Sequence, residues 1–205
     1  MTHPRSRLNA LYKLLISSFT TSTFAESIIL PIYAIFVQKV GGSILDAGIA
    51  YGLFLITEAA FTMVVHRYKW DANQRIGLMV GGWLIWLGGV FTYLLISDIW
   101  MLFVCQVLMA IGNAVADPVI DEELAAHTDM GLEEFEWGIF EGSKAFSDGA
   151  AAIVGAAIAA YLGFGVLIWF MVAVATASFL MILVYVMKLR KMRPEMSAAS
   201  AVIDR

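Results

Sequence analysis

The chain has 205 residues, of which 60% are apolar and only 15% are charged, and its formal net charge is −4. Such a composition excludes an ordinary soluble domain and indicates a protein embedded in the lipid bilayer. The weak negative charge gives no reason to expect a nucleic-acid partner. The single cysteine, Cys105, excludes an internal disulfide and a metal site built from several cysteines. We expect neither a metal nor a cofactor.

The charged residues fall in short segments that separate apolar stretches of about 20 residues, the length of an α-helix that crosses a bilayer. We predict an all-α membrane protein with six transmembrane helices over Leu14–Val37, Leu45–Val65, Ile76–Ile96, Met101–Ile120, Gly138–Leu162 and Val166–Met187. The first stretch is too long for the apolar core of a signal peptide and no small-residue cleavage site follows it, so we expect it to be retained. Residues 1–13 then form a basic N-terminal segment, residues 14–187 one transmembrane domain, and residues 188–205 a basic C-terminal tail.

Lysine and arginine lie almost entirely on one side of the predicted bundle. That side carries Arg5, Arg7, Lys13, Arg67, Lys69, Arg75, Lys188, Arg190, Lys191 and Arg193. The connections on the other side carry only Lys39. By the positive-inside rule, both termini are cytoplasmic, and we expect a multi-pass protein of the plasma (inner) membrane. The acidic connection over residues 121–137 lies on the same side, because carboxylates have little influence on topology.

Several ionisable side chains are predicted inside the membrane, where a charge costs about 2.5–3.5 kcal/mol even on the mildest insertion scale. Glu26 and Glu58 fall near the middle of the first and second spans, and the fourth span carries a polar stripe that includes Gln106 and Asp121. A low-dielectric environment disfavours a charged carboxylate, so such a group can exchange a proton near neutral pH. We predict a hydrated cavity that binds protons or a cationic group and is lined by Glu26, Glu58, Asn113, Asp117, Lys144 and Asp148.

Structural roles stay open for most of these residues. Lys144 could form an ion pair with Asp117, or with Asp148, which lies four residues further along the same helix face. Asp117 could instead cap a short helix that begins at Pro118, and Asn113 could bond a neighbouring helix. Glu26 is the strongest candidate for a functional carboxylate, because no basic residue lies within two turns of it.

Small residues at helical spacing predict where helices come close together in a membrane. The second span carries one such pair, the third span three glycines, and the fifth span two ridges. Their members are Gly48, Gly52, Gly77, Gly81, Gly88, Gly138, Gly142, Ala151, Gly155 and Ala159.

Two short motifs and a helix rich in small residues carry a resemblance to a known family. The connection between the second and third spans reads HRYKWDANQRIG, with Asp71 and Arg75 four residues apart. In the fourth span Gly112 and Pro118 are six residues apart, and the fifth span contains GAAAIVGAAIAAYLG. With six spans and both termini on one side, the chain resembles the N-terminal half of a major facilitator superfamily transporter.

The chain departs from the family pattern at several positions. Two glycines of the family's loop motif fall on Arg67 and Gln74. The arginine and the first glycine of its fourth-span motif fall on Gln106 and Ala110, and the proline of its fifth-span motif is absent.

In full-length members of that family, two six-helix halves are related by an axis along the membrane normal. The resemblance implies that two copies of this chain form a parallel homodimer and work as a half-size secondary transporter by alternating access. Glu26, Asn113 and Asp117 would line a cavity on the axis, and Asp71 and Arg75 would form a cytoplasmic gate against the partner. We expect a small-molecule or ion substrate. Protons and cationic solutes are favoured, because carboxylates outnumber bases in the spans.

Other functions are open to different degrees. An enzyme is not expected, because the chain has no G-x-S-x-G or H-E-x-x-H motif and His3, His66 and His127 all lie outside the predicted spans. No carbonyl-filter sequence of a channel is present. The alternative that stays open is a non-transporting membrane scaffold or assembly protein that has kept the fold.

Overall fold

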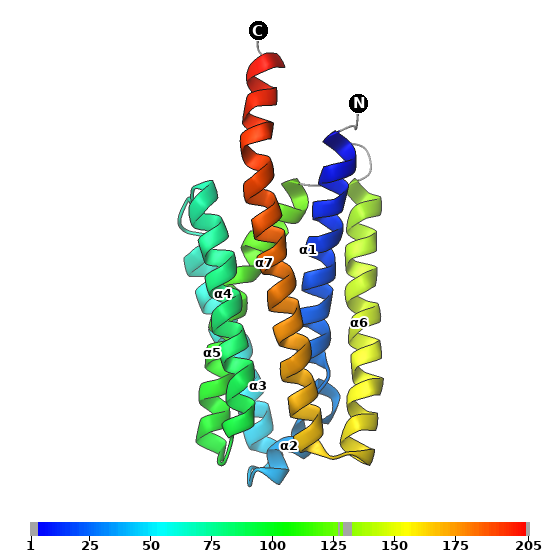
Figure 1. The fold of residues 1–205 in the computed structure, drawn as a ribbon. Coiled ribbons are helices and arrows are strands. Elements are labelled where there is room, and N and C mark those ends of the chain that lie inside the picture. The colour runs from blue at the N-terminus through cyan, green and yellow to red at the C-terminus, as the bar shows by residue number, and fades with distance from the viewer. Residues whose placement is uncertain (1–3, 127, 129–132, 204–205) are drawn as a thin grey trace.

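Long helices make up the described part of the chain, which comprises residues 4–126, 128 and 133–203 of a computed structural model. The elements are α1 (Pro4–Ser27), η1 (Leu30–Ile32), α2 (Tyr33–Lys39), α3 (Ile44–Val65), α4 (Ala72–Thr92), η2 (Tyr93–Leu95), α5 (Ile99–Ala126), α6 (Glu133–Tyr161) and α7 (Phe164–Ile203). The long helices run side by side, and the chain begins and ends at the same end of the bundle (Figure 1). The predicted all-α membrane fold is confirmed.

Five helical segments among the described residues are long and apolar enough to cross a membrane. They are Ala10–Lys39, Ile44–Val65, Ala72–Leu95, Ile99–Ala126 and Phe164–Met192, and they match the predicted first, second, third, fourth and sixth spans. The predicted fifth span forms α6, which is 29 residues long and packs against α1. Its charged residues Glu141, Lys144 and Asp148 reduce its hydropathy, so α6 does not belong to the apolar set.

The first predicted span is broken near its end and is not the single helix that we expected. The backbone N–H of Ile28 makes the last α-helical bond of α1, to the carbonyl of Phe24. Pro31 then lies at the start of η1. A proline has no N–H to donate and its ring crowds the carbonyl one turn earlier, so Pro31 weakens the helix at the point where α1 ends.

The acidic connection predicted over residues 121–137 is mostly helical. Helix α5 continues to Ala126 and α6 begins at Glu133, so part of the acidic cluster extends α5. Pro118 lies inside α5, so the prediction that Asp117 caps a helix beginning there is wrong. At the C-terminus, α7 continues without interruption into the predicted 188–205 tail as far as Ile203. His3 and His127 lie outside the described residues.

The helices pack in a crosswise pattern. Helix α1 packs against α6 and α7, whereas α5 packs against α3 and α4, and the contact between α4 and α7 joins these two groups. The spans divide into a first half (α1, α3 and α4) and a second half (α5, α6 and α7). The first helix of each half packs against the last two helices of the other half. In Figure 1, α7 lies between α3–α5 on one side and α1 with α6 on the other.

Glycines allow the closest approaches between helices. A Cβ atom added to Gly112 of α5 would lie 2.5 Å from the backbone nitrogen of Trp86, and one on Gly82 of α4 would lie 2.8 Å from the carbonyl oxygen of Gly112. On α6, a Cβ on Gly155 would overlap the carbonyl of Ile28 at the break after α1. Among the glycines of the predicted ridges, Gly155 therefore packs against a neighbouring element, the segment after α1. A Cβ would meet open space within the described structure at Gly48, Gly52, Gly77, Gly81, Gly88, Gly138 and Gly142.

These contacts predict which glycine is needed for stability. Gly112→Ala forces the backbones of α4 and α5 apart and should destabilise the protein by about 1–3 kcal/mol, the usual cost of overpacking. Thermal unfolding in detergent should show a clear fall in the midpoint. Gly88→Ala is the matched control, because its Cβ meets open space. An unchanged midpoint for Gly112→Ala would contradict the close α4–α5 contact.

Candidate functional site

Glu26 is the penultimate residue of α1 and lies directly before the break in the first span. The Nδ2 of Asn113 on α5 donates to both of its carboxylate oxygens, at 3.4 Å and 3.3 Å. These distances are at or beyond the long end of the usual hydrogen-bonding range, so the amide orients the carboxylate without satisfying it fully. Within the described part of the chain, Glu26 forms no ion pair. The charged groups that interact with it electrostatically are themselves acidic, and they include Glu58, Asp117 and Asp148.

Carboxylates from three helices gather next to Glu26. Asp117 of α5 is close enough to interact electrostatically with Glu26 of α1 and Glu58 of α3, as well as with Lys144 of α6. Glu58 and Asp117 also line an open groove of about 520 Å³. Its other lining residues are Thr62, His66, Pro118, Asp121, Glu122, Ala125 and Trp137. The groove leads from these carboxylates toward the end of the bundle where α3 and α5 finish.

Within the described structure, Lys144 and Asp148 do not form the ion pair that their spacing of four residues allows. Among the described residues, Lys144 forms its ion pair with Glu141, at 4.0 Å, and its Nζ lies 5.8 Å from the ring centre of Phe19. Asp148 instead accepts a hydrogen bond of 2.6 Å from the hydroxyl of Ser27 at the end of α1. Asp148 therefore ties α6 to the break beside Glu26.

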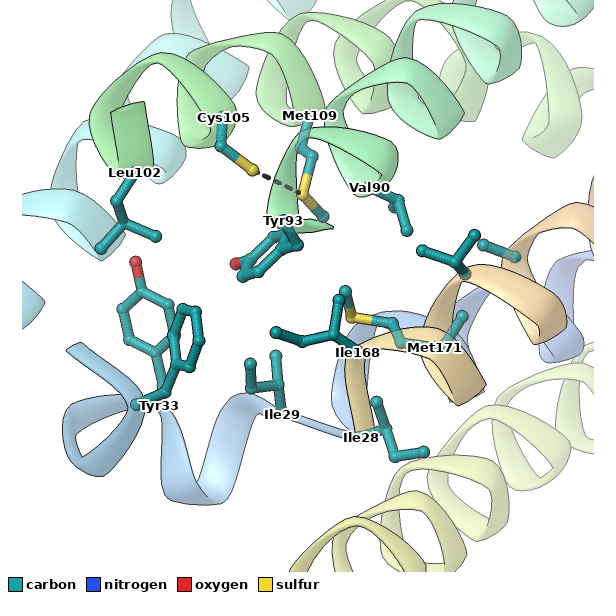
Figure 2. Packing of buried hydrophobic residues seen from close by; sticks show 14 of the residues in the cluster. Ile28, Ile29, Tyr33, Val90, Tyr93, Leu102, Cys105, Met109, Ile168 and Met171 are labelled. Atoms are coloured by element: carbon teal, nitrogen blue, oxygen red, sulfur yellow. Dashed lines mark hydrogen bonds between the residues drawn. The ribbon is translucent and has the colours of Figure 1, made fainter. Parts of the chain in front are cut away.

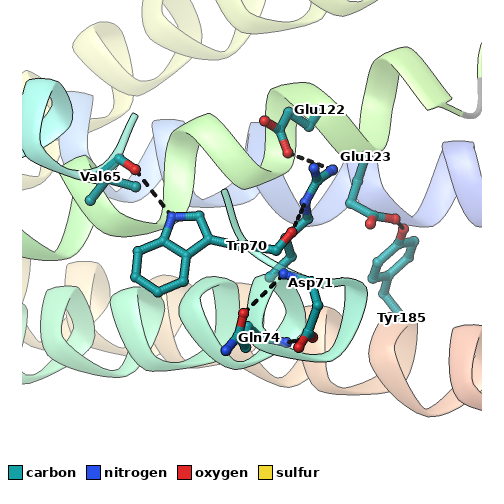
Figure 3. Close-up of polar contacts among 8 residues, drawn as sticks. Val65, Trp70, Asp71, Gln74, Glu122, Glu123 and Tyr185 are labelled. Atoms are coloured by element: carbon teal, nitrogen blue, oxygen red, sulfur yellow. Dashed lines mark hydrogen bonds and ion pairs between the residues drawn. The ribbon is translucent and has the colours of Figure 1, made fainter. Parts of the chain in front are cut away.

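The two residues of the predicted gate, Asp71 and Arg75, lie at the start of α4, and Figure 3 shows Asp71 there next to Gln74. Asp71 caps α4, because its carboxylate accepts from the backbone N–H of Gln74 while its own N–H donates to the Gln74 side chain, each at 2.9 Å. Arg75 forms an ion pair of 2.8 Å with Glu122 on α5 and donates to the carbonyl of Trp70.

Next to this ion pair, the hydroxyl of Tyr185 on α7 donates to Glu123. Helix α5 is thus joined to the start of α4 through Arg75 and to α7 through Tyr185, both within one chain. Glu122 has no distinguishing signal in the sequence, because it is one of several carboxylates in the acidic segment over residues 121–137.

At the opposite end of the site, Gln106 makes a buried network with two tyrosines. Its Nε2 lies 2.6 Å from the hydroxyl of Tyr33 on α2 and 3.2 Å from that of Tyr93 on η2. Figure 2 shows both rings within one apolar cluster. A cavity of about 30 Å³ separates this network from Glu26. The sequence marks Gln106 as part of a polar stripe, but the two tyrosines carry no signal that distinguishes them from other aromatic residues in the spans.

The comparison with known proteins agrees with this architecture. The family model of the Major Facilitator Superfamily matches residues 15–202. The chain belongs to the major facilitator superfamily. Each six-helix half in this superfamily contains two inverted three-helix repeats, and the crosswise packing of α1 and α5 fits such a pair.

One relative is an uncharacterized MFS-type transporter, YitZ, of Bacillus subtilis (strain 168). It is 27% identical to this chain over 140 residues, which cover 66% of this chain and 82% of the relative. The relative is therefore the shorter of the two proteins.

The contact between Ser27 and Asp148 can be tested by a double-mutant cycle. Ser27→Ala and Asp148→Ala should each lower the midpoint of thermal unfolding, and the pair should show a coupling energy of about 1 kcal/mol because they remove one hydrogen bond. Tyr12→Phe removes a different buried hydrogen bond, to the carbonyl of Glu136, and should be additive with Asp148→Ala. Full additivity of Ser27→Ala with Asp148→Ala would contradict the contact.

Proposed function

We propose that two copies of this six-helix chain form a parallel homodimer that moves a small cationic solute by alternating access, with Glu26 as the carboxylate that binds the solute or a coupling proton. Membership of a superfamily of transporters supports transport rather than catalysis. In this proposal the protein lies in the plasma (inner) membrane with both termini in the cytoplasm, as the distribution of lysine and arginine indicates.

One observation carries the proposal: three carboxylates from different helices lie together on a side of the bundle that the chain leaves open. Within the described residues, Glu26, Glu58 and Asp117 form no ion pair, and the groove beside them is open. Charged or protonated carboxylates are costly against lipid tails. This side of the bundle therefore requires water or another protein, and a second copy of the chain would enclose the groove as a polar cavity.

The neighbouring helices support a partner on the same side. Large apolar side chains are exposed on the face of α3 that carries Glu58; Leu55 and Tyr51, three and seven residues before it, are 46% and 40% exposed. Several glycines on α3 and α6 have open space beside them, which lets a partner helix approach closely. The start of α1 and the end of α7 lie at one end of the bundle (Figure 1), so a parallel pair would place these ends of both copies on one side of the membrane.

The proposed gate at the start of α4 uses contacts that already exist in one chain. Arg75 pairs with Glu122, and both side chains are about half exposed. Such a pair contributes little to stability, about 0–1 kcal/mol, so exchanging it for a contact with the partner costs little. We propose that Asp71 and Arg75 make this exchange when the cytoplasmic side closes.

A non-transporting scaffold is the second candidate. It is favoured by the replacement of the family's fourth-span arginine by Gln106, which here holds two tyrosines. The scaffold makes a different prediction about the carboxylates, because a protein that only assembles others has no need of an ionisable Glu26.

The proposal predicts that Glu26→Gln abolishes flux while the protein stays folded, because glutamine keeps the size and the contact with Asn113 but cannot ionise. The measurement is flux into proteoliposomes, with a pH-sensitive dye for protons and a radiolabelled organic cation for the solute. Glu134→Gln is the matched control, since Glu134 is exposed at the start of α6. Flux at the wild-type rate in Glu26→Gln would contradict the role of Glu26, and no flux in the wild type would favour the scaffold.

A further inference from the structure

We propose that α2 is a movable gate over Glu26, and that Gln106 holds this gate shut through Tyr33 and Tyr93. The gate lies at the end of the bundle opposite to Asp71 and Arg75. This inference rests on the proposed transport through the Glu26 site, and it assigns to Gln106, Tyr33 and Tyr93 a role in controlling access to it.

The Gln106 network joins three elements inside an apolar layer. Gln106, Tyr33 and Tyr93 are only 5%, 7% and 4% exposed. Leu102, Phe36 and Met109 belong to the same buried cluster. A polar side chain in such surroundings is costly unless its hydrogen bonds are made. The network therefore favours one closed arrangement of α2 against α5, and α2 leaves it only when these bonds break.

The break before α2 allows it to move separately from α1. The segment between Ser27 and Tyr33 contains Pro31, which cannot donate to the carbonyl one turn before it. The last α-helical bond ends at Ile28, and the next backbone bond joins Ile32 to Ile29 within a short 3₁₀ turn. In the described chain, no continuous helix ladder couples α2 to α1. A change in the angle of α2 therefore does not require α1 to unwind.

Beyond the Gln106 network, α2 packs against α3 through apolar side chains of the same buried cluster, and it makes ring contacts with η2 and α7. Phe36 packs against the rings of Tyr93 and Phe164, with ring centres 5.7 Å and 5.6 Å away. Lys39 places its Nζ 5.0 Å from the ring centre of Phe164 on α7. Aromatic pairs are favourable in more than one arrangement, offset-stacked or edge-to-face, whereas the hydrogen bonds of Gln106 need one defined geometry. The Gln106 network is thus the specific element that fixes the closed position.

The two sides of Glu26 differ in openness. On one side, its neighbours Glu58 and Asp117 line the groove of about 520 Å³. On the other side, the cavity that Glu26 shares with Tyr33, Tyr93 and Gln106 measures about 30 Å³, which is enough for a water molecule and too little for a solute. Alternating access requires the side of the small cavity to open while the side of the groove closes. The Gln106 network lines the small cavity and therefore opposes its opening.

The test measures access to a cysteine placed in the small cavity. Ile29, which lines the cavity and is 4% exposed, is replaced by cysteine in a Cys105→Ala background. A membrane-impermeant, positively charged methanethiosulfonate is then added from the α2 side or from the groove side of the membrane. Tyr33→Phe removes one hydroxyl and Gln106→Leu removes both bonds. Tyr12→Phe is the control, because it removes a buried interhelical bond elsewhere.

Loss of one hydrogen bond from the closed state should raise the labelling rate from the α2 side by about 2-fold to about 10-fold. Gln106→Leu should raise it further, while labelling from the groove side and in Tyr12→Phe stays at the reference rate. An unchanged rate in Tyr33→Phe, or an equal rise from both sides, would overturn the gate. If Gln106→Leu does not fold, Tyr33→Phe decides the matter alone.

The labelling result does not depend on flux. A wild-type protein that labels as expected but moves no solute would refute the proposed transport and leave the gate standing. A protein that transports while Tyr33→Phe labels as the reference does would refute the gate alone.

Discussion

A carboxylate is costly to leave against lipid tails, and much of this bundle is arranged around that constraint. Glu26, Glu58 and Asp117 come from α1, α3 and α5 and lie close enough to interact with one another. The apolar side chains exposed on α3 and α6 tolerate lipid, but the groove beside the carboxylates does not. A superfamily in which two six-helix halves enclose a central cavity offers a direct solution. The homodimer that we propose has this form.

Helix α5 organises the site along its length. One face of the helix carries Gln106, Asn113, Asp117 and Asp121, and these residues contact different parts of the site. Gln106 holds two tyrosines, Asn113 orients Glu26, and Asp117 and Asp121 line the groove. The break at Pro31 adds a second feature, because it ends α1 directly after Glu26 and separates α2 from the rest of the span. One polar helix face therefore connects a closed end of the site to an open end.

The sequence predicts the helices better than the contacts between them. Apolar stretches identify the helices because the bilayer imposes a length of about 20 residues. Pro31 was a readable signal for the break, but the apolar stretch continues through it and hides it. Glycine spacing alone does not say which face of a helix meets a neighbour, so Gly155 met one while Gly138 did not. Glu26 and Asn113 stand out because polar groups are rare in spans, whereas Tyr33, the partner of Gln106, is 73 residues away in sequence and resembles other aromatic residues.

Pairing of two chains is the central claim, because in the proposal a second copy encloses the open groove and completes the gate on α4. The most direct measurement is native mass spectrometry of the purified chain released from lipid nanodiscs, combined with a flux assay on the same preparation. We expect a particle of two copies that transports. A single copy that transports would contradict the account, because its carboxylates would then function without the second half of the cavity.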